Sequence, residues 1–242
     1  KGSDTKDEER AKALRDEAVA KARAYAAAGD PVLFIGGLDH EHDLEGRDRT
    51  TMALPYGQDE LLDALLNADS DTILAFVAGS PIEMPWADKA KAIVWNWYAG
   101  CESGTALAEV LLGRVNPSGH LPETFPIALS DEPAHAIGTF GLEGHVDYKE
   151  DIYVGYRYFD TKQVPVRFPF GHGLSYTSFE YSDLTVRRVD DEIRVSLHVK
   201  NTGDCAGKTV VQVYLGLEGT GEDRPAKELK GFEKVELQAG ES

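Results

Sequence analysis

The chain has 242 residues, of which 25 are Lys or Arg and 42 are Asp or Glu, so its formal net charge at pH 7 is -17. This charge repels phosphate groups and anionic lipid head groups, and we therefore expect neither nucleic acid nor a membrane as a partner. A hydrophobic content of 42% is enough for a buried core and for more than one domain.

The first part of the chain alternates predicted helices and strands. An Ala-rich, charged stretch from Asp7 to Ala28 carries apolar residues at helical spacing, which predicts an amphipathic helix. Residues 31–35 form an apolar run before two glycines, the pattern of a strand buried on both faces. The further predicted elements are a polar loop over 39–55, a helix over 59–67, strands over 72–77 and 92–97, and a helix over 102–112. This alternation predicts an α/β fold, a three-layer α/β sandwich with a mostly parallel sheet, over residues 1–130.

The second part of the chain has a different texture. Residues 131–178 mix Pro, Gly, His and aromatic side chains, which predicts an ordered connection between domains, in which Arg157 requires a carboxylate partner. Alternating strands are then predicted over 184–186, 193–199 and 210–215, separated by turn residues. Residues 179–242 are therefore predicted to form an all-β sandwich of the immunoglobulin or fibronectin III type, and one that is incomplete.

The loop after the first predicted strand carries most of the polar chemistry. Residues 37–49 contain five carboxylates, two histidines and two arginines. Ligands of open α/β sheets bind beyond the carboxyl ends of the strands, so a carboxylic acid here is placed to act as a general acid. Two other interpretations stay open at this point, a solvated charged loop and a metal site at His40 and His42, although their spacing matches no specific metal motif.

Two further features offer alternatives. Cys101 and Ser103 lie in a small-residue turn between a strand and a helix, where a cysteine or serine hydrolase would place its nucleophile, but the pattern G-x-S-x-G is absent. The three tryptophans are candidates for stacking on a sugar ring, although core packing is the better explanation for at least one of Trp95 and Trp97. Cys101 and Cys205 fall in different predicted domains, which argues against a disulfide or a cysteine-based metal site. The absence of a signal peptide or an apolar span leaves cytoplasmic and secreted locations open.

The order of short motifs along the chain resembles glycoside hydrolase family 3. The matching segments are Gly37-Leu38, Glu45-Gly46-Arg47-Asp48-Arg49, Leu54-Pro55, Ala78-Gly79-Ser80-Pro81, Trp97-Tyr98-Ala99-Gly100, residues 116–126, 154–159 and 168–176, Asn201-Thr202-Gly203, and Arg224-Pro225. Each is weak by itself, but their order is specific. The resemblance covers nearly the whole chain and implies an α/β sandwich domain followed by part of a fibronectin type III-like domain.

The resemblance also implies a role for particular residues. It places the acid/base of a retaining β-glycosidase at Glu45, with Glu41 as the alternative, and a supporting role at Asp48 and Arg49, in which Arg49 pairs with Asp48 or another carboxylate. Arg47 and Arg49 would lower the pKa of the acid if they faced it. The family's nucleophile is an aspartate in a Ser-Asp-Trp context in a TIM-like barrel, and no Ser-Asp-Trp occurs here.

The expected activity is hydrolysis of terminal β-D-glucosyl residues from oligo- or aryl β-glucosides, with no cofactor and no metal. The barrel portion of the enzyme is the expected partner, so this chain alone is expected to be inactive. The alternatives are β-xylosidase or α-L-arabinofuranosidase specificity, or a non-catalytic domain for carbohydrate binding or assembly. Substrate-binding residues are not identified, and a homo-oligomer stays open.

Overall fold

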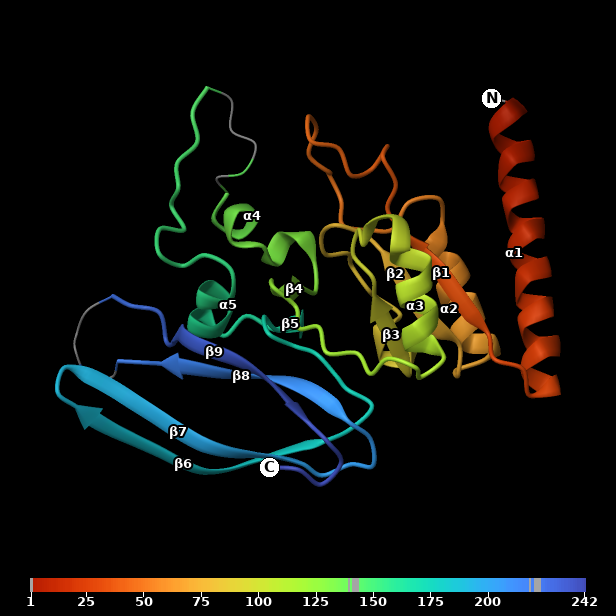
Figure 1. Cartoon of the computed structure of the whole chain (residues 1–242). Helices are drawn as coiled ribbons and strands as arrows, with labels where there is room; N and C mark the ends of the chain where they lie inside the picture. The colour runs from red at the N-terminus through yellow and green to blue at the C-terminus, as the bar shows by residue number, and fades with distance from the viewer. Residues whose placement is uncertain (1, 139, 141–143, 218, 220–222) are drawn as a thin grey trace. The chain divides into compact units, whose positions relative to one another are not determined.

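The computed structural model describes residues 2–138, 140, 144–217, 219 and 223–242 (Figure 1). The chain divides into two compact units. The first comprises the chain up to Ser103 together with Ile127–Leu129, and the second comprises Gly104–Pro126 and Ser130–Ser242. The division into residues 1–130, 131–178 and 179–242 stays a prediction beside these units. None of the helices in the described ranges combines the length and the apolar character that a membrane crossing requires.

A parallel three-stranded sheet forms the centre of the first unit, in the order β1-β2-β3. Its elements are α1 (Gly2–Ala28), β1 (Leu33–Gly37), α2 (Gln58–Ala68), β2 (Ile73–Val77), the 3-10 turns η1 (Ala87–Lys89) and η2 (Gly100–Glu102), and β3 (Ala92–Trp95). The parallel α/β fold predicted from the sequence is therefore confirmed. The central strand β2 is buried on both faces, since Leu74, Ala75 and Phe76 are fully covered.

Strand β1 differs from its prediction. Phe34 is buried and lies against Phe76, with ring centroids 5.8 Å apart, but Leu33 and Ile35 are 42% and 59% exposed. The prediction of burial on both faces is wrong, because only the face of β1 that bears Phe34 packs against the aromatic core, and the face that bears Leu33 and Ile35 is exposed.

The predicted N-terminal helix is confirmed as α1, which lies beside α2. Arg15 of α1 pairs with Glu60 of α2, with 2.8 Å between the guanidinium nitrogen and the carboxylate oxygen. Of the apolar face predicted for this helix (Leu14, Ala18, Ala22 and Tyr25), Ala22 is buried, whereas Leu14 and Tyr25 are both 57% exposed.

The predicted strand over 92–97 ends earlier, at Trp95. Trp97 has a φ of 46°, a left-handed conformation that a bulky residue rarely adopts and that turns the chain out of the sheet. The last bond along this edge is donated by the Asn96 amide to the Phe76 carbonyl at 2.8 Å. The helix predicted over 102–112 is α3, Ser103–Leu111.

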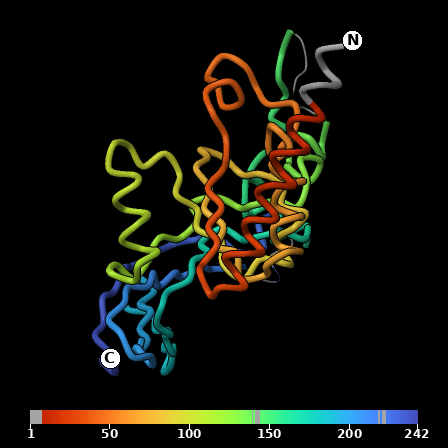
Figure 2. Tube along the Cα trace, turned by 90° about the vertical axis from the view of Figure 1, so that its right-hand side faces the viewer, coloured from red at the N-terminus to blue at the C-terminus, as the bar shows by residue number. Residues whose placement is uncertain are grey.

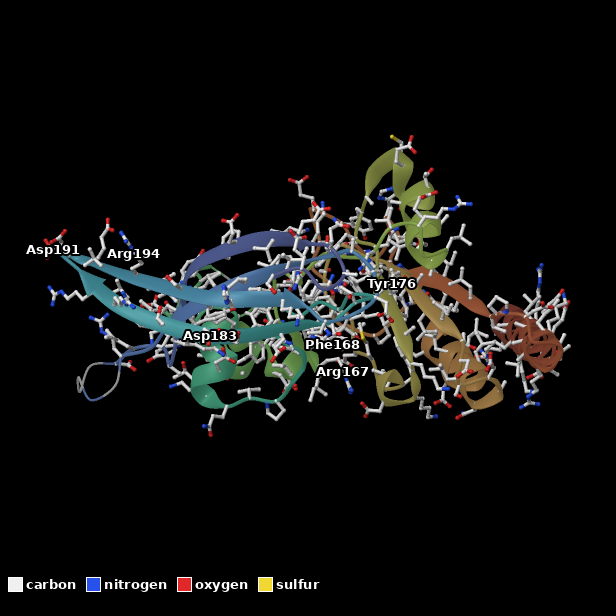
Figure 3. All side chains as sticks on the ribbon, turned by 60° about the horizontal axis from the view of Figure 1, so that its bottom comes forward. Arg167, Phe168, Tyr176, Asp183, Asp191 and Arg194 are labelled. Carbon is white, nitrogen blue, oxygen red and sulfur yellow. The ribbon has the colours of Figure 1, made fainter. Side chains whose placement is uncertain are left out.

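The second unit contains two antiparallel hairpins, β6-β7 and β8-β9, and a short pair, β4-β5. Its elements after α3 are β4 (Phe125–Pro126), η3 (Leu129–Asp131, which begins in the first unit), α4 (Pro133–Ile137), α5 (Tyr156–Lys162), β5 (Val166–Phe168), β6 (Phe179–Val189), β7 (Glu192–Asn201), β8 (Gly207–Leu215) and β9 (Glu228–Leu237). Figure 3 shows Asp191 and Arg194 at the outer tip of the β6-β7 hairpin, with Asp183 further back along it. The predicted strands are confirmed but are longer than predicted, and β9 was missed.

Two asparagines hold the irregular segments next to these hairpins. Asn116 accepts hydrogen bonds from the Ser175 hydroxyl (2.9 Å) and the Tyr176 amide (2.8 Å), and donates to the Ala206 carbonyl (2.9 Å). Asn201 is fully buried. It donates to the carbonyls of Cys205 (2.8 Å) and Leu237 (3.1 Å), and accepts from the Thr177 hydroxyl (2.6 Å) and the Gly203 amide (3.1 Å). We call residues 116, 175–177, 201–203 and 205–206 the asparagine junction.

The partner required by Arg157 also lies in this unit. The guanidinium Nε of Arg157 lies 3.6 Å from the Glu228 carboxylate of β9, and the guanidinium carbon lies 5.4 Å from the ring centroid of Tyr156. Both members of the ion pair remain about one-third exposed, at 37% and 33% of the side chain. The predicted carboxylate partner is therefore found, although it is only partly buried.

Candidate active-site loop

The loop after β1 begins at a tightly constrained glycine. Gly37 has a φ of 140°, and a Cβ added to it would lie 1.9 Å from the Val77 carbonyl oxygen of β2. Its amide donates to the Gln58 side chain of α2, and the Gln58 amide group donates back to its carbonyl, both at 2.9 Å. Residues 39–50 leave the carboxyl edge of the sheet from this fixed root. The orange loop extends beyond the strand ends in Figure 1, and Figure 2 shows it as a projecting, curled segment of the trace.

Asp39 fixes the first turn of the loop. Its carboxylate lies 2.8 Å from Nδ1 of His42, and accepts hydrogen bonds from the Tyr56 hydroxyl (2.7 Å) and the Glu41 amide (3.0 Å). The bond from His42, followed by that from Tyr56, lowers the pKa of Asp39 to about 2. The same contact with Asp39 raises the pKa of Tyr56 to about 12. Asp39 is therefore an ionised anchor and a poor proton donor.

Asp43 connects the middle of the loop to the end of β3. The Tyr98 hydroxyl donates to the Asp43 carboxylate at 2.6 Å. The pair lies against Gly79, which follows β2, because a Cβ on Gly79 would lie 2.5 Å from the Tyr98 ring and 2.9 Å from the Asp43 carboxylate. Segments after all three parallel strands therefore meet at this point.

Arginines hold the remainder of the loop. Arg49 donates from Nη2 to the Ser80 hydroxyl (3.0 Å) and the Pro81 carbonyl (2.8 Å), and Arg47 donates to the Glu41 carbonyl (3.0 Å). Each of these bonds ends on a neutral oxygen. The carboxylate partner proposed for Arg49 stays a prediction.

Glu45 lies at the tip of the loop. Leu44 and Arg47 form an isolated antiparallel bridge, so Glu45 and Gly46 occupy the turn between them, and both are exposed. Glu41 and Asp48 are also exposed, but Glu41 belongs to the Asp39 turn through its amide and carbonyl. Glu45 is therefore a carboxyl group at the tip, flanked on both sides by tethered residues.

The other candidates from the sequence occupy different environments. The Ser103 hydroxyl accepts a 2.7 Å hydrogen bond from the Asn96 side chain, an amide that cannot act as a base, and Cys101 is exposed. Trp86 is a core residue, stacked on Phe76 at 5.2 Å and donating to Asp59 at 2.8 Å. Trp95 lies 5.9 Å from the Phe76 ring centroid.

The metal interpretation finds no ligand set in the described part of the chain. There, no three or more His, Cys, Asp or Glu side chains are grouped as they would be to hold a metal ion. His42 is directed to Asp39.

Sequence reasoning counted Asp43 among the loop carboxylates without giving it a positioning role, and it missed Gly79 and Tyr98 as part of the site. Gly79 and Tyr98 lie in motifs that directly follow the second and third predicted strands. The rule that ligands bind beyond the carboxyl ends of parallel strands, applied to every strand, would have singled out both positions.

Two family models match the chain. The model for the glycosyl hydrolase family 3 C-terminal domain matches residues 4–176, and the model for the fibronectin type III-like domain matches residues 209–242. The thermostable beta-glucosidase B of Acetivibrio thermocellus is 46% identical over 232 residues, covering 94% of this chain and 31% of that protein. Beta-glucosidase BoGH3A of Bacteroides ovatus is 47% identical over 233 residues, covering 93% of this chain and 31% of that protein.

Solved structures give the same result for the fold. A beta-glucosidase from Kluyveromyces marxianus in complex with glucose matches with a TM-score of 0.87 and 46% identity, covering 93% of this chain and 27% of that one. A beta-glucosidase from Bifidobacterium adolescentis matches with a TM-score of 0.87 and 40% identity, covering 95% of this chain and 34% of that one. The chain thus spans about a third of the length of these relatives.

Proposed function

The chain belongs to glycosyl hydrolase family 3, and from this we propose that it supplies Glu45 as the acid/base of a retaining β-glucosidase. In this proposal residues 1–130 carry the acid/base loop, and residues 131–178 connect them to a fibronectin III-like part over 179–242. The nucleophilic aspartate comes from a barrel that lies outside residues 1–242, so we expect residues 1–242 by themselves to hydrolyse no substrate.

One observation carries the choice of Glu45. Asp39 and Asp43 act as hydrogen-bond acceptors inside the loop, and the backbone of Glu41 is engaged on both sides. Glu45 instead lies at an exposed tip beyond the carboxyl edge of the sheet, where a substrate held by a second domain is within reach. The two arginines near it in sequence donate to neutral oxygens.

The proposed reaction requires two carboxyl groups about 5 to 5.5 Å apart. The barrel aspartate attacks the anomeric carbon while Glu45 gives its proton to the glycosidic oxygen, so the glycosidic bond breaks as the glycosyl-enzyme ester forms. Glu45, now a carboxylate, takes a proton from water, and the resulting hydroxide displaces the aspartate. Both proton transfers use the same carboxyl group, which a tip that faces the substrate allows.

The test is Glu45→Ala in the complete polypeptide that includes the barrel. We expect kcat/KM for an aryl β-glucoside with a poor leaving group to fall by about 10² to 10⁴-fold. The rate of the first step with 2,4-dinitrophenyl β-glucoside should change little, because that leaving group departs without a proton. Added azide should restore turnover of this substrate, because azide attacks the intermediate without a general base.

Glu41→Ala is the matched control, since Glu41 is a nearby exposed carboxylate in the same loop. A large loss with Glu41→Ala and wild-type activity with Glu45→Ala would move the role to Glu41. Unchanged activity on poor leaving groups in both variants would refute the assignment to this loop.

A further inference from the structure

The contact between Tyr98 and Asp43 joins two parts of the chain that lie 55 positions apart in the sequence. Asp43 is two residues before Glu45, and Tyr98 follows β3, so the hydroxyl connects the sheet to the segment just before the loop tip. On the other side of the tip, Arg49 is bonded to Ser80 and Pro81, which follow β2. The tip therefore lies between two tethers, one to the segment after β3 and one to the segment after β2.

The backbone around this contact is shaped to hold it. Gly79 has no left-handed φ, so its lack of a side chain serves space rather than conformation. The space is filled by the Tyr98 ring and the Asp43 carboxylate, at 2.5 Å and 2.9 Å from where a Cβ would lie. Trp97, immediately before Tyr98, has the strained left-handed backbone already described, with a φ of 46°. Such strain persists only where surrounding contacts determine the conformation.

We propose that Tyr98 is a positioning residue for Glu45, acting through the Asp43 carboxylate with Gly79 as the surface on which the pair rests. This proposal rests on the proposed function of Glu45. A general acid must lie within hydrogen-bond reach of the glycosidic oxygen, and a displacement of about 1 Å can cost about 10²-fold in rate. Without the Tyr98 hydroxyl, Asp43 loses its hydrogen bond to the segment that follows β3, and the part of the loop before the tip is then held through its root and the Asp39 turn.

The protonation state of Tyr98 is consistent with this role. Burial, followed by the bond to Asp43, raises the pKa of Tyr98 to about 12. The phenol therefore keeps its proton and remains a donor across the range in which a glycosidase works.

The first test measures loop order on this chain, without activity. We expect hydrogen exchange in residues 39–49 to be at least about 10-fold faster in Tyr98→Phe and in Gly79→Ala than in the wild type, with exchange in the β6-β7 hairpin unchanged. Tyr148→Phe is the matched control, because it removes a hydroxyl from a side chain that is 81% exposed. Unchanged exchange of the loop in Tyr98→Phe would overturn the proposal.

The second test uses the complete enzyme and leaving groups of different pKa. Tyr98→Phe should lower kcat for a poor leaving group by about 10-fold with KM unchanged, and should leave the first step with 2,4-dinitrophenyl β-glucoside near the wild-type rate. An equal loss with both substrates would show a general structural defect and overturn the positioning role.

Glu45→Ala in the same series separates the two proposals. If it shows the leaving-group dependence and Tyr98→Phe does not, the positioning role alone fails. If Glu45→Ala shows none, the acid/base assignment fails and the positioning role fails with it.

Discussion

The loop over residues 39–50 and the asparagine junction are both irregular segments held by side chains, but they use different chemistry. In the loop the acceptors are the carboxylates of Asp39 and Asp43, in partly exposed positions. In the junction they are the side-chain carbonyl oxygens of Asn116 and Asn201, the second of which is fully buried.

This difference follows from where each segment has to lie. An ionised carboxylate accepts hydrogen bonds but donates none, and its burial is costly, so it suits a segment that stays near solvent. A neutral amide both donates and accepts, so one buried asparagine satisfies carbonyls and amides that the hairpins leave unpaired. Both regions contain family motifs. Carboxylate acceptors mark the region that stays near solvent, and amide groups mark the region that packs around the buried Asn201.

Gly37→Ala should have the largest effect and should break the loop at its root. The new Cβ would overlap the Val77 carbonyl, which belongs to the sheet backbone and cannot move independently. We expect the free energy of unfolding to fall by at least about 3 kcal/mol, measured by urea denaturation. Gly46→Ala is the matched control in the same loop, because nothing lies within 4 Å of its added Cβ. Equal stability of the two variants would contradict the constraint at Gly37.

Asn201→Ala should be the most damaging change in the junction. It removes both donors and the acceptor of a fully buried side chain and leaves the Cys205 and Leu237 carbonyls without it. We expect a loss of about 2 to 4 kcal/mol of unfolding free energy, since unsatisfied buried groups cost about 1 to 3 kcal/mol each. Asn67→Ala, which removes an exposed amide on α2, should cost about 0.5 kcal/mol or less. If Asn201→Ala lost no more unfolding free energy than Asn67→Ala, water would have to replace the hydrogen bonds of the Asn201 side chain.

As the pH falls, the second unit should lose stability before the loop over residues 39–50 loses its order. Burial, followed by the charge of His120, lowers the pKa of His172, which stacks on Phe168 with ring centroids 5.0 Å apart. A folded-state pKa below the ordinary 6.5 means that the unfolded chain binds more protons, so the contribution of His172 is present above pH 6.5 and is lost as the pH falls through its lowered pKa.

We therefore expect His172→Gln to flatten the decline of unfolding free energy below pH 6.5, measured by denaturation at several pH values. His198→Gln, at an exposed position on β7, is the matched control. Asp39 loses its contribution in the same direction but at lower pH: its pKa of about 2 keeps it ionised, and its contribution is lost only as the pH falls from the ordinary 3.8 towards 2. This order would be contradicted if, on lowering the pH, hydrogen exchange in residues 39–50 accelerated before the unfolding free energy declined.

Tyr56→Phe should have the smallest effect of the set. It removes one of the donors to the Asp39 carboxylate and leaves that of His42 in place. The pKa of Asp39 should therefore rise from about 2 towards its ordinary 3.8 without reaching it, as measured by NMR titration of the carboxyl carbon. An unchanged pKa would mean that the Tyr56 hydroxyl contributes nothing to the anchor.

Much of the fold was predictable because its signals are local. The apolar run of β2 and the charged, Ala-rich stretch of α1 each reveal their element within a few residues. The loop after β1 was predictable as a site for the same reason, because its position after a strand and its carboxylates are visible in the sequence.

The missed features depend on residues far apart in the chain. The exposure of Ile35 depends on which elements cover that face of β1, which its own residues do not reveal. The end of β3 at Trp95 results from a left-handed Trp97, a conformation for which tryptophan carries no preference. In β9 the apolar side chains alternate with Lys and Glu, a pattern that resembles a solvated surface. The contact of Tyr98 with Asp43 bridges 55 positions, beyond any local pattern.

The close fit of Gly79 against Asp43 and Tyr98 has a consequence for how this protein can evolve. A side chain gained at position 79 removes the room for the aromatic ring, and loss of the ring removes the reason for the glycine. These three positions should therefore change together among relatives rather than independently, and the acid and the ring should be lost in the same lineages that acquire a larger residue at the glycine. We therefore expect the support of the loop to vary as a single unit, although its residues are dispersed over three segments of the chain.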